Sequence, residues 1–174
     1  MESDFDAQRV IFEADAFFSL QRIDGVPHSE ANFSMIQARA ILGEILVSEC
    51  ELRNILRQAQ LKSDNPEQVQ LVSRILVSVA DICMELENLI TELGGDPTNL
   101  SVTRPTIDTS TSLKQLLEAA GPIQRNIMAR LDEVMARPAV RTHAARLLAI
   151  RQFHVANILW LADALGLNAD GKKH

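Results

Sequence analysis

The amino-acid sequence predicts an all-α protein built as a four-helix bundle. Three observations predict it: a helix-forming composition, long apolar runs at helical spacing, and a repeated hairpin. Of the 174 residues 47% are apolar, whereas Gly and Pro number only 7 and 6 and Tyr is absent. Leu, Ala, Ile, Glu, Gln and Arg dominate, which favours helix over sheet. A chain of this length can bury one core without metal or disulfide staples.

Four long helices are expected after a short N-terminal one. The short helix is predicted within residues 6–20, and Asp24-Gly25-Val26-Pro27 ends it; its apolar residues at helical spacing are Val10, Ile11, Ala14, Phe17 and Phe18. The long helices are predicted at about 31–61, 66–93, 112–136 and 138–165. We therefore expect an N-terminal extension over residues 1–30, a bundle over 31–168 and a polar tail over 169–174.

Turn formers separate these helices. Ser63-Asp64-Asn65-Pro66-Glu67 supplies a cap and a Pro for a first helical position, and Gly94-Gly95-Asp96-Pro97 is typical of a helix end. Arg137-Pro138 predicts a tight turn, and Gly121-Pro122 predicts a kink or a break near the start of the third long helix. Residues 98–111 are rich in Thr, Ser and Pro and show no period, so a long connection is expected there.

A displacement of 72 residues superimposes the two halves without a gap. Arg53-Asn54-Ile55 falls on Arg125-Asn126-Ile127, Pro66 falls on Pro138, and Leu93-Gly94 falls on Leu165-Gly166. The sequence thus repeats one helical hairpin, at 42–97 and 114–169. Short turns within each hairpin and a long connection between them predict two antiparallel hairpins joined by a crossover along the bundle.

This pattern resembles the ferritin-like superfamily, whose members have such a hairpin pair, a long crossover and often an LGG-[DN]-P ending on the second helix. Here that ending is Leu93-Gly94-Gly95-Asp96-Pro97, and the resemblance covers about residues 35–168. A di-iron centre in such a bundle takes a Glu from each of two helices and a Glu-x-x-His pair from each of the other two.

The resemblance places the two His ligands at Ile82 and His154, and their paired Glu positions at Val79 and Arg151. The second long helix therefore has apolar residues at both of its ligand positions. On the first long helix Glu49 or Glu51 is expected to point inward, whereas the matching positions in the third are Gly121 and Ile123, which supply no side-chain ligand. Most of the ligands that the resemblance implies are missing, and no working metal site is expected.

Arg151 is expected on the inward face of the last helix, where its charge would replace the missing metal. A buried guanidinium needs a carboxylate partner, for which Glu49, Glu51 and Glu118 are candidates. The hypothesis is a polar core cluster of Arg151, His154 and one such Glu at the former metal site. His154 is interpreted as a hydrogen-bonded core histidine, with a residual ligand, a proton-active group or a phospho-acceptor as alternatives.

Four aromatic residues are candidates for contact with another protein. Phe12, Phe17 and Phe18 lie outside the repeated unit, where they either meet a partner or cover one end or side of the bundle. Trp160 flanks the apolar stripe of the last helix, where it either anchors a partner or completes the core.

Composition and motifs argue against several classes of function. The net charge of −6, without a dense basic stripe, argues against nucleic acid as a partner. Long apolar spans and a signal-like N-terminus are absent from the sequence, so a cytoplasmic protein with no membrane partner is expected, with reduced Cys50 and Cys83. No catalytic motif is found.

We therefore expect a non-catalytic bundle without a cofactor that binds a protein partner or forms a homo-oligomer. The alternative is a metal- or cofactor-binding oxidoreductase that uses iron or another divalent metal at Glu49, Glu51, Glu118 and His154. A small-molecule binder in the vacated core is a third possibility.

Overall fold

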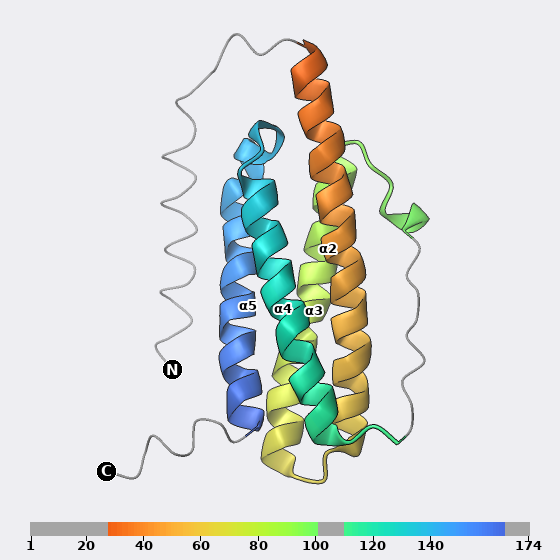
Figure 1. The fold of residues 1–174 in the computed structure, drawn as a ribbon, viewed down its shortest axis with the longest axis vertical. Helices are drawn as coiled ribbons and strands as arrows, with labels where there is room; N and C mark the ends of the chain where they lie inside the picture. Colours follow the sequence, from red (N-terminus) through yellow and green to blue (C-terminus); the bar gives the residue numbers. More distant parts are fainter. Residues whose placement is uncertain (1–27, 101–109, 166–174) are drawn as a thin grey trace, which may run out of the picture.

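The computed structural model describes residues 28–100 and 110–165, and all regular structure in these ranges is helical (Figure 1). The long helices are α2 (His28–Lys62), α3 (Pro66–Glu92), α4 (Leu113–Met135) and α5 (Ala144–Ala164), and the short 3-10 helices are η1 (Pro97–Asn99) and η2 (Pro138–His143). The prediction of an all-α fold is confirmed. The expected N-terminal helix and polar tail lie outside the described residues.

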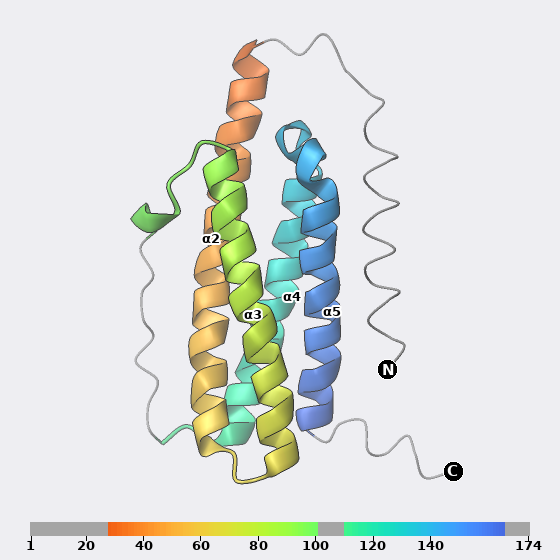
Figure 2. The same ribbon diagram turned by 180° about the vertical axis from the view of Figure 1, so that it is seen from behind.

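The four long helices lie side by side along the longest axis of the molecule (Figures 1 and 2). α2 packs on α3 and α4, and α5 packs on the same two helices, so that α2 and α5 stand diagonally opposite each other. α2 and α5 run in one direction, and α3 and α4 run in the other. Every neighbouring pair is therefore antiparallel.

The two hairpins are joined across the length of the molecule. α3 ends at one end of the group of helices, and α4 begins at the other end (Figure 1). The chain must therefore run the length of α4 between them, as the long connection in the sequence suggests; residues 101–109 lie outside the described ranges. A simple up-and-down order of the helices would not require this crossing.

Local signals fix where the helices begin. The side chain of Asn65 accepts a hydrogen bond from the Glu67 backbone N–H, with Pro66 in the first turn of α3. Ser112 and Gln115 form a capping box, in which each side chain accepts from the other residue's backbone N–H. Both caps satisfy N–H groups that have no partner inside their helices.

The end of α3 explains the two glycines of its closing motif. Gly94 N–H donates to Thr91 O at 2.9 Å and Gly95 N–H donates to Ile90 O at 2.8 Å, which together make a Schellman motif. Gly94 has φ 76°, in the left-handed region that glycine adopts without strain. Its carbonyl accepts from Arg39 Nη1 of α2 at 2.7 Å, so the turn is also tied to the neighbouring helix.

α4 differs from the prediction at Gly121-Pro122. The helix continues from Leu113 to Met135 with Pro122 inside it, so a break at this point was wrong. Proline removes one backbone donor from the ladder, but packing of the apolar face of α4 keeps the helix together around it. That face consists of Leu116, Leu117, Ala120, Ile127, Leu131 and Val134.

Buried apolar side chains from all four long helices form one core. Its largest fully buried members include Leu42, Leu52, Leu56, Ile75, Leu86, Leu89, Leu117, Ile127, Leu131 and Leu147. Within the described ranges, no helix combines the length and apolar character that crossing a bilayer requires.

Candidate functional site

Four polar side chains are fully buried in this hydrocarbon core. They are Glu49 of α2, Gln124 of α4, and His154 and Asn157 of α5, each with 0% of its surface exposed. Burial of a polar group is costly unless a partner replaces the lost water. We call these four residues the polar core, and it is the first candidate site.

Glu49 and His154 are in direct contact. His154 Nε2 lies 2.6 Å from Glu49 Oε1, with both side chains closed off from solvent. Two bare lone pairs would repel at this distance, so one of the two atoms carries a proton. That proton lies between Nε2 and Oε1, so each group supplies the polar contact that the other lost on burial.

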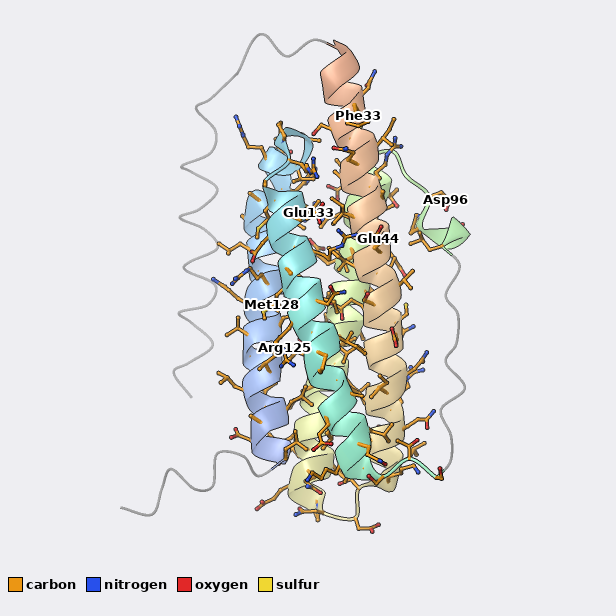
Figure 3. The ribbon with its side chains drawn as sticks, in the orientation of Figure 1. Phe33, Glu44, Asp96, Arg125, Met128 and Glu133 are labelled. Carbon is orange, nitrogen blue, oxygen red and sulfur yellow. The ribbon has the colours of Figure 1, made fainter. Side chains whose placement is uncertain are left out.

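Gln124 lies at the level of this pair along the bundle. Arg137 Nη1, two residues after the end of α4, donates to Gln37 Oε1 of α2. Seven residues away along the chain in each case, Arg130 of α4 pairs with Glu44 of α2; Figure 3 labels Glu44 on α2 and Glu133, a second partner of Arg130, on α4. Continuing the same antiparallel register places Gln124 opposite Cys50, the residue after Glu49. The α4 amide therefore belongs to the same layer of the core as Glu49.

Asn157 links the polar core to α3. Its Nδ2 donates to Ser78 Oγ at 3.3 Å, and it lies one helical turn after His154 on the same side of α5. Among the described residues, no hydrogen-bond partner is found for Asn157 Oδ1, for either end of the Gln124 amide or for Glu49 Oε2. The core thus contains several unpartnered acceptor atoms, to which a polar or cationic ligand could bind.

Two thiols border this layer. The Gln60–Ser73 hydrogen bond sets the register of α2 against α3 and places Cys83 opposite Cys50. Burial, and after it the nearby Glu49 carboxylate, raises the pKa of the Cys83 thiol from 9.0 to about 12. Cys50 is partly exposed, and Arg53 Nη2 lies 3.8 Å from its sulfur. Both cysteines are free thiols, as expected.

Arg151 is not part of the polar core, and the predicted Arg151–His154 cluster was wrong on this point. Its side chain lies at the surface and donates to Asp132 of α4, with Nε 2.7 Å from Oδ1. The buried position is Ile150, one residue earlier, which is 100° away around the helix.

The core face of α5 includes Ile150 in place of Arg151 without a large rotation of the helix. Leu147, His154 and Leu161 are buried, as are Ile75, Ile82 and Leu89, which lie 72 residues earlier on α3. Arg151 instead lies at the edge of this face and extends to Asp132.

The other residues that were predicted for the site lie in different parts of the molecule. Glu51 is exposed on α2, and Glu118 is exposed on α4 where it pairs with Lys114, so neither lies in the core. Trp160 packs, partly buried, against the core. Phe12, Phe17 and Phe18 lie outside the described residues. Of the predicted cluster, the structure brings together Glu49 and His154 alone.

Sequence reasoning missed Gln124 and Asn157. A signal for Gln124 was present, because the displacement by 72 residues superimposes it on Leu52, which is a core position. Asn157 follows His154 by three residues, the spacing that puts two side chains on one face of a helix. Both signals are weak, since polar residues at such spacings usually face solvent.

The outer side of α5 is a second candidate site. It carries the exposed apolar residues Leu148 (44% exposed), Phe153 (51%), Val155 (43%) and Leu159 (58%). Between them lie only small or uncharged residues: Ala145, Ala149, Gln152 and Ala156. We call these eight residues the outer face of α5. A bundle helix normally presents charged residues to solvent, so this face differs from the usual pattern.

A groove between α3 and α5 borders the outer face. It encloses about 390 Å³ and is lined on the α5 side by Ala145, Ala149, Ile150 and Phe153. Arg146 closes its rim by pairing with Glu85 and with Glu92, whose Oε2 lies 2.6 Å from Arg146 Nη1. The Arg146 guanidinium holds the pKa of the Glu92 carboxyl below its usual value. The groove is thus apolar at its base and has a paired, polar rim.

Comparisons with protein-family models, with curated proteins and with solved structures found no match to this chain. In the described ranges, no three His, Cys, Asp or Glu side chains are grouped so that they could hold a metal ion. The polar core and the outer face of α5 therefore have to be interpreted from their own chemistry.

Proposed function

We propose that this protein is a ferritin-like bundle whose di-metal centre has been lost, and that it works by binding a second copy of itself rather than by catalysis. The order and directions of α2 to α5, with a crossing between the hairpins, support the ferritin-like assignment. So does the glycine ending of α3.

The residues in the core do not fit a di-iron centre. Such a centre requires four Glu and two His as its metal ligands. Of the positions at which the resemblance places ligands, Val79 and Ile82 are buried hydrocarbon, and Arg151 is turned to the surface. The polar core offers one carboxylate, one imidazole and two amides. This set of side chains supports the proposal that the di-iron centre has been lost.

The uncharged outer face of α5 is the observation that carries the proposal of self-association. Two copies that each carry a net charge of −6 repel each other, and the repulsion is least where the touching surfaces have no charge. A two-fold contact also requires a surface that complements itself. The amide of Gln152, at the centre of the face, meets this requirement because it both donates and accepts hydrogen bonds.

The size of the face predicts a weak dimer. A stable interface buries about 800 Å² on each partner, which exceeds what one side of a helix offers. Its apolar residues still supply the central contact that such interfaces use. We therefore expect a reversible dimer in exchange with the monomer, formed by packing the α5 helices of two copies against each other.

Sedimentation equilibrium of the full chain tests this function. The wild-type protein should show an average mass that rises from monomer toward dimer as its concentration increases through the micromolar range. Leu159→Glu should remain monomeric, because the contact would bury a carboxylate in an apolar surface without a partner. Val77→Glu is the matched control, since Val77 is an exposed apolar residue on α3. Equal dimerisation of wild type and Leu159→Glu would refute this interface.

A second candidate function, binding of a single divalent cation, rests on the unpartnered acceptors of the polar core. Glu49, His154, Gln124 and Asn157 all carry atoms that lack hydrogen-bond partners, and carboxylate, imidazole and amide oxygen are metal ligands. Titration with Mn²⁺ and Zn²⁺ followed by calorimetry tests it. Binding of one equivalent that Glu49→Gln abolishes would favour this function over a purely structural core.

A further inference from the structure

The two cysteines face each other across the contact between α2 and α3. Gln60 of α2 donates to Ser73 Oγ of α3 at 2.8 Å, which sets the register of these two antiparallel helices. Ten residues before Gln60 is Cys50, and ten residues after Ser73 is Cys83. The two thiols are close enough for a hydrogen bond between them. The first hairpin therefore brings one pair of sulfur atoms together.

This pair is closed on one side and open on the other. Cys83 belongs to the core with 3% of its surface exposed, whereas Cys50 is partly exposed, and both are free thiols. A ligand can thus enter from solvent beside Cys50 and be covered by the core beside Cys83. Thiolates are soft donors, and they bind soft metal ions in preference to hard ones.

Arg53 brings a positive charge to the same place. It follows Cys50 by three residues on α2, and its Nη2 lies 3.8 Å from Cys50 Sγ. The side chain is partly buried, and within the described residues its Nε has no hydrogen-bond partner. No carboxylate in these ranges forms an ion pair with it. A guanidinium partly removed from water favours a negative charge beside it, which two neutral thiols do not supply.

Glu49 does not supply that charge either, although it is next to Cys50 in the sequence. Consecutive residues of a helix point about 100° apart, and Glu49 is directed to α5, where its Oε1 lies 2.6 Å from His154 Nε2. The carboxylate is therefore engaged in the polar core, and the guanidinium of Arg53 is left beside the thiols.

The number of donors and their charge limit which metal ion fits. In the described parts of the chain no three His, Cys, Asp or Glu side chains are grouped so that they could hold a metal, so the site offers two sulfur atoms. Structural Zn²⁺ requires four ligands, whereas Cu⁺ favours thiolate sulfur and can be held by two. Cu⁺ with two thiolates carries one negative charge, which Arg53 balances. A divalent ion would leave the complex neutral and Arg53 unpaired.

We propose that Cys50 and Cys83 form a two-coordinate site for Cu⁺, with Arg53 as the charge partner of the complex. Binding forms two copper–sulfur bonds and releases both thiol protons to solvent, and copper stays Cu⁺ throughout. The bound ion joins α2 to α3 within the first hairpin. The site lies on different helices from the outer face of α5 and uses none of the four residues of the polar core, so it does not depend on the functions proposed above.

Anaerobic titration of the reduced full chain with Cu⁺ tests this site. The chelator bathocuproine disulfonate competes for the ion, and the fall in absorbance of its copper complex reports transfer to the protein. Wild type should take up one equivalent. X-ray absorption of this complex should show two sulfur atoms and no nitrogen next to copper. Ag⁺ should displace the bound ion, whereas excess Zn²⁺ should not.

Substitutions at the site should lower the affinity to different extents. Cys50→Ser and Cys83→Ala should each lower it by about a hundredfold or more, because each removes one of two ligands. Arg53→Gln should lower it by about tenfold, because the thiols remain and only the balancing charge is lost. Arg57→Gln is the matched control, since Arg57 is exposed one turn later on α2, and it should bind like wild type.

Three results would contradict the proposal. Unchanged affinity in Cys50→Ser overturns it, and this variant is decisive even where Cys83→Ala fails to fold, because Cys50 is partly exposed. Nitrogen next to copper, together with loss of binding in Glu49→Gln, would move the ion to the polar core and also overturn it. Equal affinities of Arg53→Gln and wild type would refute the charge balance on which the choice of Cu⁺ depends.

Discussion

His154 Nε2 on α5 lies 2.6 Å from Glu49 Oε1 on α2, so two helices that stand diagonally across the bundle meet at its centre. α2 belongs to the first hairpin and α5 to the second, and the contact therefore joins the two halves of the chain through the core. Both side chains are fully buried, which makes each of them dependent on the other.

Removing either partner should strongly destabilise the protein. His154→Ala or Glu49→Ala leaves the other group buried without a partner, and we expect each to lower the free energy of unfolding by about 3–5 kcal/mol. Replacing both by apolar residues of similar size, Glu49→Leu with His154→Leu, should recover most of this loss or exceed wild type. Urea unfolding followed by circular dichroism measures all three variants.

Glu51→Ala is the control for this series, because Glu51 is exposed two residues from Glu49, and its effect should stay within about 0.5 kcal/mol. If the double replacement cost as much as the sum of the two single ones, the pair would not be coupled. That result would contradict the structural role assigned to the contact.

The Arg151–Asp132 pair should contribute far less, although it has good geometry. Its Nε–Oδ1 distance is 2.7 Å, but both side chains are reached by solvent. Arg151→Leu should therefore change the free energy of unfolding by no more than about 1 kcal/mol, the range of surface ion pairs. The same urea measurement at low and high salt checks this, and a loss of several kcal/mol would place Arg151 back in the core.

Periodicity was sufficient to predict the helices because their apolar faces and caps are local features. Asn65, Ser112 and the two glycines at Gly94 and Gly95 act within a few residues of their own positions. The burial of His154 was predictable for the same reason, since it lies within the 3.6-residue pattern of the α5 core face.

The orientation of Arg151 could not be predicted from the repeat. Arg151 lies at the edge of the core face of α5, and its partner Asp132 belongs to the neighbouring helix α4. Gln124 was missed because its burial depends on the packing of α4 against α2, which the linear pattern does not contain. Tertiary register, rather than local preference, determines which polar residues occupy the core.

Substitution by alanine should affect stability differently at the two glycines that end α3 and at a glycine within a helix. Gly94→Ala should cost about 1–2 kcal/mol, because an L side chain is strained at φ 76°. Gly95→Ala should also be destabilising, since its Cβ would lie 2.8 Å from Ile90 Cγ2 and 3.0 Å from Ile90 O. Thermal unfolding measures both.

Gly121→Ala is the matched control and should change stability in the opposite direction. Its Cβ would meet Arg125 Nη1 at 3.5 Å, an ordinary contact, inside the continuous helix α4. Alanine is favoured over glycine in a helix interior by about 0.5–1 kcal/mol. Destabilisation by Gly121→Ala would indicate that α4 is interrupted at Gly121-Pro122 after all.

The two cysteines should differ sharply toward a thiol reagent. Burial, followed by the Glu49 carboxylate, raises the pKa of Cys83 to about 12, whereas Cys50 is partly exposed. At mildly alkaline pH, Ellman's reagent should modify Cys50 in the native protein and both thiols only after unfolding, because the thiolate is the reactive form. Native Cys50→Ser should then show no fast reaction, and native Cys83→Ala should react like wild type.

The raised pKa of Cys83 also predicts how the free energy of unfolding changes at alkaline pH. The Cys83 thiol ionises near 9.0 when the chain is unfolded and only at about 12 when it is folded. Its contribution to stability is therefore fully present below pH 9 and is lost as the pH rises from there toward 12. Urea unfolding at pH 8 and pH 10 should show a larger loss for wild type than for Cys83→Ala. Equal losses, together with fast labelling of Cys83, would show that this thiol is open to solvent rather than enclosed beside Glu49.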